Sequence, residues 1–519
     1  MSDMLRDSTR PQEVVSPDAV LARVTGPGSP FEIGERDGLR QFVAAPPDLN
    51  LLIESARRYG DRTCVIDFDS AGVERRMSYD QVFAWRDELV PILHITRGDR
   101  VAIAMRNRAE WLVAFLAVMK AGGVAVLVNS RGSGPELLAM LEDVDPAVVL
   151  ADSERAAAIR ESGFKGRVLD LTRPFDAEEL ARRIAEPMPD PGVAKPTDPC
   201  AILFTSGTTG RVKGAVLSHR NVITGLMTTQ MSGMVVLGNM AAQMGTTTEA
   251  LIAQMPQQAS LLVYPLFHIS GLGSGFLSPF LGGGKVVIMR RWDAEEAARL
   301  IAAEQISMFS AVPTMLWDIL HRARIEGTSL ASLRNIGCGG QALPVNLVEE
   351  VHALCPHAQI GTGYGMTECS GAIAQAVGPE FMARPAAAGR RLSMVDVRIE
   401  GPDGEILPPA RPARSSCAGR RSCPATGTAP RTPPPFSPPM AGCAPAMSGS
   451  STTTTTSSSS TARRTWSFRA ARTSTAPRSS ACSARSPASP NAPPSACPTN
   501  ALASASSRSS SLPTSTRPA

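Results

Sequence analysis

The sequence predicts an α/β fold in which large, layered and largely parallel sheets pack against helices. Between about residues 50 and 410, short apolar runs of strand type alternate with segments of helical length. That alternation is typical of sheets whose parallel strands are joined by helices. With 519 residues, the chain is also long enough for two to four domains with large cores.

The alternation is clearest in two stretches. In the first, the apolar run Arg100–Met105 precedes Ala109–Ala121, which has helical length and is largely apolar. Two further strand-like runs are expected around a helix near residues 135–142, at Val124–Val128 and Ala147–Ala151. The second stretch repeats the scheme, with strand, helix and strand expected at Lys285–Met289, Ala294–Ala303 and Ile306–Ala311.

The composition changes abruptly after Pro409. Residues 411–519 contain 13 Arg but no Lys, Asp or Glu, and Ser, Thr, Ala and Pro dominate there. Without these 13 residues, the rest of the chain has 39 basic residues and 47 acidic ones. The positive net charge of the whole chain therefore comes entirely from the tail, and it is no argument for nucleic-acid binding. A tail of this composition cannot bury enough apolar surface to offset its ordering entropy. We expect an N-terminal extension (1–48), a main domain (49–409) and a disordered low-complexity tail (410–519).

The composition of the tail is that expected when a gene is translated in a shifted reading frame. With plausible codons read from the third base, residues 413–428 become GEIVVRGPSVMPGYW and residues 440–448 become DGWLRTGDV. Residues 451–475 become approximately DDDDDFVFIVDRAKDMVIPGGENIY, and residues 494–504 become close to GVPDERLGE. Four protein-like fragments in one frame predict a one-base deletion or two-base insertion near codons 408–412.

The chain carries no sequence signal for a membrane or for secretion. No apolar run approaches the roughly 20 residues that span a bilayer, and residues 1–48 lack the apolar segment of a signal peptide. Five cysteines are scattered through the main domain without metal-ligand spacing: Cys64, Cys200, Cys338, Cys355 and Cys369. Reduced thiols and a cytoplasmic location are therefore expected.

The most specific motif is Ile202–Gly214, in which an apolar strand runs into a loop with three glycines, four hydroxyl groups and a lysine. Glycines let backbone N–H groups approach phosphate oxygens, hydroxyls add donors, and Lys213 supplies a mobile positive charge. A Walker loop is the obvious competitor, but its Gly-Lys-Ser/Thr ending is absent. We therefore predict a polyphosphate site of a different type, rather than an ordinary polar turn.

Three further stretches are weaker when taken alone. Gly361–Cys369 (GTGYGMTEC) offers a flat ring, a short hydroxyl and a carboxylate suited to Mg²⁺. Gly337–Pro344 (GCGGQALP) could be only a tight turn between a strand and a helix. Val263–Leu272 (VYPLFHISGL) places His268 in an apolar frame, where a satisfied core histidine is the plain alternative.

Together, and in this order along about residues 50–405, the four stretches resemble the adenylate-forming (AMP-binding) superfamily, and in particular its acyl-CoA synthetases, the fatty-acid–CoA ligase type. The resemblance implies the large N-terminal domain of these enzymes. Leu392–Leu407 is also similar to the strand pair that opens their next subdomain. One departure is Val212, which stands where the family usually has a proline before the lysine.

The resemblance also implies residue roles. Lys213, Thr367, Glu368 and His268 would be catalytic, with Glu368 the Mg²⁺ ligand and His268 at the mouth of the carboxylate pocket. Tyr364 would stack on adenine. The remaining nucleotide contacts would be Thr205, Ser206, Gly207, Thr208, Thr209, Gly210, Gly339, Gly340, Gln341 and Gly365.

The implied reaction uses ATP, Mg²⁺ and CoA to convert a carboxylic acid, expected to be a fatty acid, to an acyl-adenylate and then a thioester. The family also uses an Asp in Thr-Gly-Asp, a hinge Arg and a late Lys, all in or near a small mobile C-terminal domain. After Pro409 the chain has neither Thr-Gly-Asp nor the Asp-Arg-x-Lys-Asp motif that carries the hinge Arg, and it has no Lys after Lys285. We therefore expect that domain to be absent and activity to be impaired. An amino-acid-adenylating domain and a non-catalytic nucleotide- or acyl-binding protein remain as alternatives. The sequence does not predict an oligomeric state.

Overall fold

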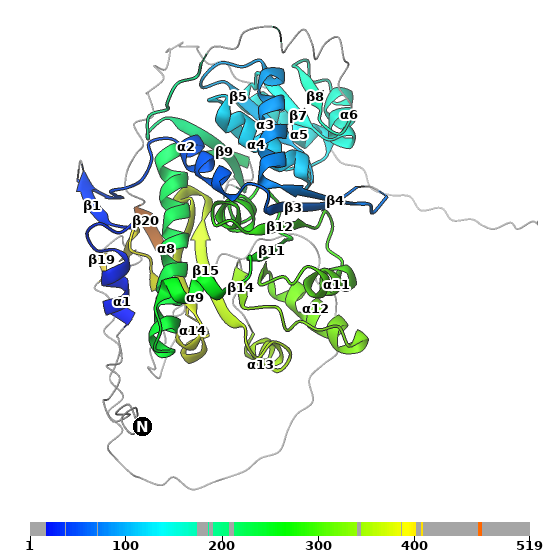
Figure 1. Ribbon diagram of the computed structural model, residues 1–519. Helices are drawn as coiled ribbons and strands as arrows, with labels where there is room; N and C mark the ends of the chain where they lie inside the picture. The colour runs from blue at the N-terminus through cyan, green and yellow to red at the C-terminus, as the bar shows by residue number, and fades with distance from the viewer. Residues whose placement is uncertain are drawn as a thin grey trace, which may run out of the picture. The chain divides into compact units, whose positions relative to one another are not determined.

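The computed structural model describes residues 17–36, 38–69, 71–173, 185, 190–206, 212–339, 344–385, 387–400, 406–407 and 466–469. Two large sheets organise the first compact unit of the chain, residues 1–473 (Figure 1). Both are built mainly from parallel strands, which confirms the predicted α/β class.

The six-stranded sheet has the order β10-β9-β6-β5-β7-β8. All neighbouring pairs are parallel except β9 and β10, which form an antiparallel hairpin at one edge. Its strands are β5 (Arg100–Ala104), β6 (Val124–Leu127), β7 (Val148–Ala151), β8 (Val168–Asp170), β9 (Pro199–Ser206) and β10 (Val212–Ser218).

The nine-stranded sheet has the order β17-β16-β15-β14-β13-β11-β12-β3-β4. Its central strands β15 to β3 are parallel, and antiparallel pairs close both edges. Its strands are β3 (Thr63–Phe68), β4 (Glu74–Ser78), β11 (Ala259–Leu262), β12 (Lys285–Ile288), β13 (Met308–Ala311), β14 (Asn335–Gly339), β15 (Gln359–Met366), β16 (Gly371–Val377) and β17 (Arg390–Arg391).

Successive side chains of each strand point to opposite faces of its sheet, and the buried residues form three separate clusters. In β5, Val101 and Ile103 face a central cluster that also receives Val286 and Ile288 of β12. The opposite faces of the two sheets are covered separately, the six-stranded one by α5 and α6 and the nine-stranded one by α11, α12 and α13. The layers are therefore helix, sheet, helix, sheet, helix. The outer helices are α5 (Gly134–Val144), α6 (Ser153–Glu161), α11 (Ala294–Ala303), α12 (Pro313–Glu326) and α13 (Val345–Leu354).

Helix α4 (Ala109–Lys120) occupies the central layer between the sheets. Every residue from Ala109 to Met119 is buried, as expected for a helix that is apolar on all sides. Trp111 and Phe115 stack with ring centroids 5.8 Å apart. The other helices that contribute to this layer are α2 (Leu49–Glu54), α3 (Tyr79–Leu93), the N-terminal part of α8 (His219–Gln243), the π-helix η2 (Gly271–Leu277) and α10 (Ser278–Leu281).

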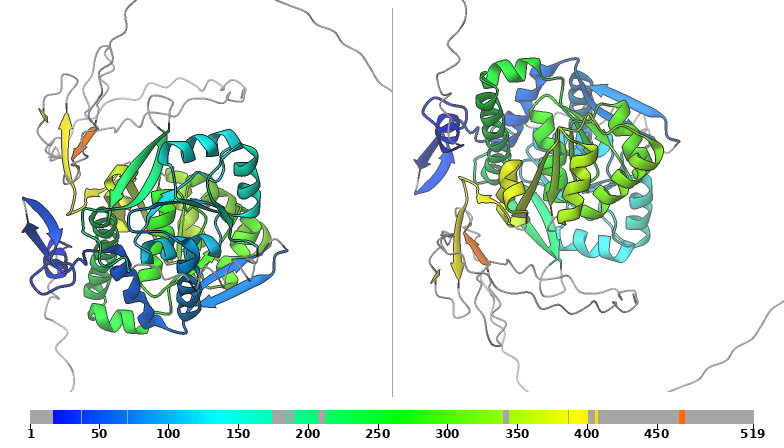
Figure 2. Two further views of the ribbon diagram at one scale, coloured as in Figure 1. Left: turned by 90° about the horizontal axis from the view of Figure 1, so that it is seen from above. Right: turned by 90° about the horizontal axis from the view of Figure 1, so that it is seen from below.

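Helix α8 runs along the flank of both sheets, beside α1 and α9 (Figures 1 and 2). Val20 of α1 is fully buried and would collide with any side chain at Gly238 of α8, so a glycine there lets the two helices approach closely. The remaining elements are α1 (Pro17–Val24), β1 (Ile33–Arg36), β2 (Leu39–Phe42), the 3₁₀-helices η1 (Ser55–Tyr59) and η3 (Thr367–Cys369), α9 (Thr248–Gln254) and α14 (Pro379–Ala383).

The elements predicted from the apolar alternation are confirmed with small shifts at their ends. The expected helix Ala294–Ala303 is α11, and the expected run Ile306–Ala311 is β13, which begins two residues later. None of the helices in the described ranges has the length and hydropathy of a membrane span.

A three-stranded sheet, β19-β18-β20, follows the two large sheets. The predicted strand pair is present, because β18 (Asp396–Glu400) pairs with β19 (Ile406–Leu407) in antiparallel fashion. The third strand, β20 (Trp466–Arg469), comes from the predicted tail and is an exception to its expected lack of regular structure. The rest of the predicted tail 410–519 lies outside the described residues.

Candidate adenylation site

Most of the predicted site residues follow the carboxyl ends of parallel strands. In the six-stranded sheet, Arg106 follows β5, Arg131 follows β6, and Thr205 and Ser206 end β9. These strands are parallel, so all three segments lie along one edge of the sheet. The carboxyl edge of an open α/β sheet is where ligands of such proteins bind.

The nine-stranded sheet has the same arrangement. His268 lies in the connection after β11, and Arg290 and Arg291 follow β12. At the end of β15, Thr367 and Glu368 form the short 3₁₀-helix η3. Because β11, β12, β14 and β15 all run in one direction, these segments share the carboxyl edge of this sheet.

The two carboxyl edges meet at Asn107. This residue is 8% exposed. Its amide nitrogen Nδ2 donates to the Tyr264 carbonyl oxygen at 2.8 Å, and its Oδ1 accepts from the Leu266 backbone N–H at 3.0 Å. A second contact joins the edges farther along, where η3 packs against β10. The described candidate residues of the two sheets therefore lie along two edges that are in contact.

Lys213 lies on the exposed side of the β9–β10 hairpin. It is directly opposite Thr205 in the antiparallel register, and Thr205 Oγ1 donates to the Lys213 carbonyl oxygen at 3.4 Å. Four predicted nucleotide contacts, Gly207, Thr208, Thr209 and Gly210, lie outside the described residues, as does the side chain of Ser206. The hairpin thus presents Lys213 to solvent, on the strand that pairs with Thr205.

The β15–η3 segment holds a second group of predicted residues. Gly365 sits at an irregularity in the pairing of β15 with β16, and a Cβ there would lie 2.1 Å from the Gly371 carbonyl oxygen. Only glycine therefore permits this turn, which places Thr367 and Glu368 after it. Glu368 is exposed, whereas Tyr364 is half-buried and burial raises its pKa.

Gly339 ends β14 and lies opposite Gly363 of β15. A Cβ on Gly339 would be 3.8 Å from both the Gly363 carbonyl oxygen and the Tyr264 hydroxyl. Burial, with a smaller effect from Cys338, raises the pKa of Tyr264 to about 12, so its hydroxyl stays protonated. The other two residues predicted from this motif, Gly340 and Gln341, lie outside the described residues.

His268 belongs to a tight turn held by Asn107. The His268 backbone N–H donates to the Pro265 carbonyl oxygen at 3.0 Å, and its ring lies 4.8 Å from the Phe267 ring, centroid to centroid. A Cβ at Gly271 would lie 2.0 Å from that same Pro265 oxygen, so only glycine fits there. The side chain reaches solvent, but partial desolvation of the ring and repulsion by Arg131 lower its pKa, which leaves it neutral at pH 7.

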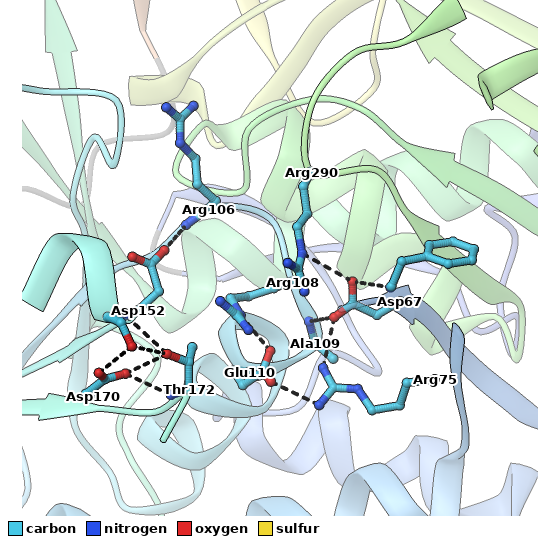
Figure 3. A network of polar contacts seen from close by, with 12 residues as sticks. Asp67, Arg75, Arg106, Arg108, Ala109, Glu110, Asp152, Asp170, Thr172 and Arg290 are labelled. Atoms are coloured by element: carbon cyan, nitrogen blue, oxygen red, sulfur yellow. Dashed lines mark hydrogen bonds and ion pairs between the residues drawn. The ribbon is translucent and has the colours of Figure 1, made fainter. Parts of the chain in front are cut away.

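A network of buried acids and arginines supports this region from behind (Figure 3). Asp67 accepts from Arg75 at 2.9 Å and from the Ala109 backbone N–H at 3.1 Å, which anchors the start of α4. Burial alone would raise the pKa of Glu110, but hydrogen bonds from Arg75 and Arg108 lower it to about 2. The network is internally neutralised, so we regard it as structural support.

The described residues include no group of three or more His, Cys, Asp or Glu that could hold a metal ion. Mg²⁺ is commonly held by one or two carboxylates together with substrate phosphates. Glu368 is exposed at the carboxyl edge, next to the hairpin that carries Lys213, and so it fits that kind of binding.

No role could be assigned from the sequence to Asn107, Tyr264 or the arginines that follow β5, β6 and β12. Tyr264 lies inside the Val263–Leu272 motif, and the others lie directly after strands that were themselves predicted. The neighbours of a single polar residue that follows a strand can be inferred only when the order of strands in the sheet is known.

Comparisons with known proteins agree with this geometry. The family profile described as "AMP-binding enzyme" matches residues 52–414. A feruloyl-CoA synthase from Amycolatopsis sp. is 31% identical over 312 residues, 60% of this chain and 58% of that protein. A 4-coumarate–CoA ligase from Oryza sativa subsp. japonica is 26% identical over 396 residues, 73% of this chain and 69% of that protein.

Among solved structures, an o-succinylbenzoate coenzyme A synthetase from Bacillus subtilis, in complex with AMP, matches with a TM-score of 0.54 and 25% identity. The match covers 70% of this chain and 85% of that one. The chain thus spans little more than half the length of the feruloyl-CoA synthase but most of this structure.

Substitution of Asn107 by Asp tests whether its amide joins the two edges. The carboxylate of Asn107→Asp can still accept from Leu266 but cannot donate to the Tyr264 carbonyl, so we expect the free energy of unfolding to fall by about 2–3 kcal/mol. Asn129→Asp is a matched control, because Asn129 Oδ1 only accepts, from the Arg131 N–H at 3.0 Å, and its change should stay within about 0.5 kcal/mol. Urea unfolding at pH 7 measures both, and equal losses would contradict the assignment.

Proposed function

Because the chain belongs to the AMP-binding enzyme family, we propose that it is built to act as an ATP-dependent carboxylate–CoA ligase. The observation that carries this proposal is the convergence of Lys213 from one sheet and Glu368 from the other, through the packing of η3 on β10. A carboxylic acid, ATP and CoA are the reactants of this proposal.

The first half-reaction joins a carboxylate to AMP. A carboxylate oxygen attacks the α-phosphorus of ATP, and the bond from that phosphorus to the bridging oxygen of pyrophosphate breaks. Two anions must be brought together, so positioning and charge stabilisation dominate the catalysis. Lys213 neutralises the polyphosphate, and the hydroxyl of Thr367 donates a hydrogen bond to it. Tyr364 stacks on the adenine, beside Gly339 at the end of β14 and Gly365 in β15.

A magnesium ion bound to Glu368 and the phosphates would supply further neutralisation of their charge. Glu368 holds this position because the β15–η3 turn, with glycine at 365, directs it to the shared edge.

The second half-reaction moves the acyl group to a thiol. The CoA thiolate attacks the acyl carbonyl carbon, and the bond from that carbon to the AMP oxygen breaks. His268 stands at the carboxylate end of this site in our proposal. A neutral ring can donate or accept one hydrogen bond without adding a charge to the reacting carboxylate.

The acid in this proposal is hydrophobic. The sequence favours a fatty acid, because small residues follow His268 at Gly271, Gly273 and Gly275. The names of the relatives given above refer to aryl acids. We therefore treat aryl acids as the competing substrate class. Competition between a fatty acid and 4-coumarate for adenylation separates the two.

The tail limits what this particular chain can do. It has no Lys after Lys285 and no Asp or Glu after Glu405. We propose that the gene carries a frame change near codons 408–412, and that the chain binds ATP but forms little or no acyl-CoA. This composition also favours a second candidate function, that of a non-catalytic nucleotide-binding protein.

Calorimetric titration with ATP tests the nucleotide site without requiring turnover. In the presence of Mg²⁺, Lys213→Ala should weaken ATP binding about tenfold or more, because it removes a charge-assisted contact worth about 1.4 kcal/mol or more. Lys165→Ala is the matched control, because Lys165 is exposed and precedes β8 at the opposite, amino edge of the sheet. Glu368→Gln should weaken binding only when Mg²⁺ is present. An unchanged ATP affinity of the Lys213→Ala variant would contradict the proposed role of the hairpin in ATP binding.

Restoring the reading frame tests the proposal about the tail. The gene read in the shifted frame from codon 410 to its stop codon should form acyl-CoA at least about 10²-fold faster than the present chain, since it regains charged groups of the reaction. ATP affinity should change less than tenfold. Sequencing of the gene around codons 405–415 provides the independent check. Formation of acyl-CoA by the present chain at the same rate as the restored one would contradict the proposal.

A further inference from the structure

A buried histidine is the first residue of α8, directly after the end of β10. His219 is 5% exposed, and none of the proposed catalytic roles uses it. Its ring nitrogen Nδ1 accepts from the Leu49 backbone N–H, at the start of α2, at 3.0 Å. Because a backbone N–H can only donate, Nδ1 is the unprotonated ring nitrogen, and the contact requires a neutral ring.

A buried aspartate stands beside the same ring. Asp48 is 6% exposed, and its Oδ1 lies 3.9 Å from His219 Nδ1, which is beyond hydrogen-bond distance. Each carboxylate oxygen of Asp48 already accepts from a backbone N–H, Oδ1 from Asn50 at 2.6 Å and Oδ2 from Ala194 at 2.8 Å. Asp48 therefore caps α2 and ties it to the segment that precedes β9.

Three segments that are far apart in the sequence meet at this ring. The His219 backbone N–H donates to the Asp198 carbonyl oxygen at 3.1 Å, and the Arg220 N–H donates to the Pro196 carbonyl oxygen at 2.8 Å. Helix α2 packs on α8 (Figure 1). The start of α8 is thus joined both to the N-terminal segment and to the connection that leads into β9.

A positive charge on this ring is unfavourable because of where the ring lies. Burial removes the solvation of an imidazolium, and the first residue of a helix is at the positive end of the helix dipole. Burial is the largest effect and lowers the pKa of His219; Asp48 and Asp198 oppose it, and Arg97 adds to it. The nearby Cys200 thiol stays neutral, because burial raises its pKa.

We propose that His219 is a pH-sensitive latch, which holds the start of α2 on α8 when its ring is neutral and releases it when the ring takes up a proton. A protonated ring has no acceptor at Nδ1, so the Leu49 N–H loses its partner. The new N–H of the ring turns to Asp48, where it competes with the backbone N–H groups that this carboxylate caps. The start of α2 and the connection before β9 are therefore loosened together.

The pH range of the latch follows from the direction of the pKa shift. In the unfolded chain the ring takes up a proton near its ordinary pKa of 6.5, and in the folded chain it does so only at lower pH. Below about pH 6.5 the folded chain therefore binds fewer protons than the unfolded one. The stability that the latch contributes is complete above that pH and is lost as the pH falls through the folded pKa.

Backbone hydrogen exchange of the full chain between about pH 7.5 and pH 5 tests the latch. After correction for the intrinsic exchange rate at each pH, protection of residues 49–54 and 194–198 should fall about tenfold, and protection of α12 less than twofold. In His219→Asn the side-chain Oδ1 takes the place of Nδ1 and accepts from Leu49 at any pH. Protection of residues 49–54 in this variant should therefore not depend on pH.

A matched control and a second measurement separate the latch from general effects of acid. His321→Asn removes an exposed histidine of α12 and should keep the full pH response of residues 49–54. Hydrogen exchange at the imidazole Cε1 of each histidine measures its pKa in the unsubstituted chain, so this result does not depend on whether a variant folds. The value for His219 should lie below 6.5.

Three results would overturn the latch. The first is a pKa of His219 at or above 6.5 in the folded chain. The second is protection of residues 49–54 that stays constant down to about pH 5 while His219 becomes protonated. The third is a pH response that is the same in His219→Asn as in the unsubstituted chain, which would assign it to another group.

Discussion

Helix α4 has no side that can face water, and much of the architecture follows from this constraint. All residues from Ala109 to Met119 are buried, so apolar faces from both large sheets must close over the helix. The helix begins two residues after Asn107, whose amide joins the end of β5 to the segment after β11. Hydrophobic burial in the central layer therefore brings together the two polar edges. Neither edge alone carries both the Lys213 hairpin and the Glu368 turn.

Charged and polar groups from both sheets suit a reaction that brings several anions together. The six-stranded sheet contributes Lys213, Arg106 and Arg131, and the nine-stranded sheet contributes Tyr264, His268, Arg291 and Glu368. Two buried acidic residues behind the site, Asp67 and Glu110, are paired with Arg75 and Arg108. The carboxyl edges are thus left with a surplus of positive charge, which favours polyphosphate ligands. The tail after Pro409 adds only arginine to the charged groups, and it brings no acid that could complete a mobile domain.

Much of the fold could be predicted from the sequence because buried parallel strands and apolar helices leave periodic signals. The runs that became β5, α4, β12 and α11 were expected within one or two residues of their observed ends. The glycines at 271 and 365 were recognised as parts of motifs, and the close approaches that require them became visible only in three dimensions. The positions of Asn107, Arg106 and Arg131 at the joined edges could not be predicted, since they depend on the order of strands in two sheets. The roles of Lys213, Thr367, Glu368 and His268 stay predictions, because they depend on ligands rather than on packing.

We propose that the joined carboxyl edges form a nucleotide site in this chain. Hydrogen–deuterium exchange of the full chain, with and without ATP and Mg²⁺, tests it most directly because the readout is local and needs no turnover. The account predicts slower exchange in residues 199–218 and 359–369, and unchanged exchange in α11 and α12 on the outer face of the nine-stranded sheet. Protection confined to α11 and α12, or no protection at a concentration of ATP that saturates binding, would contradict it.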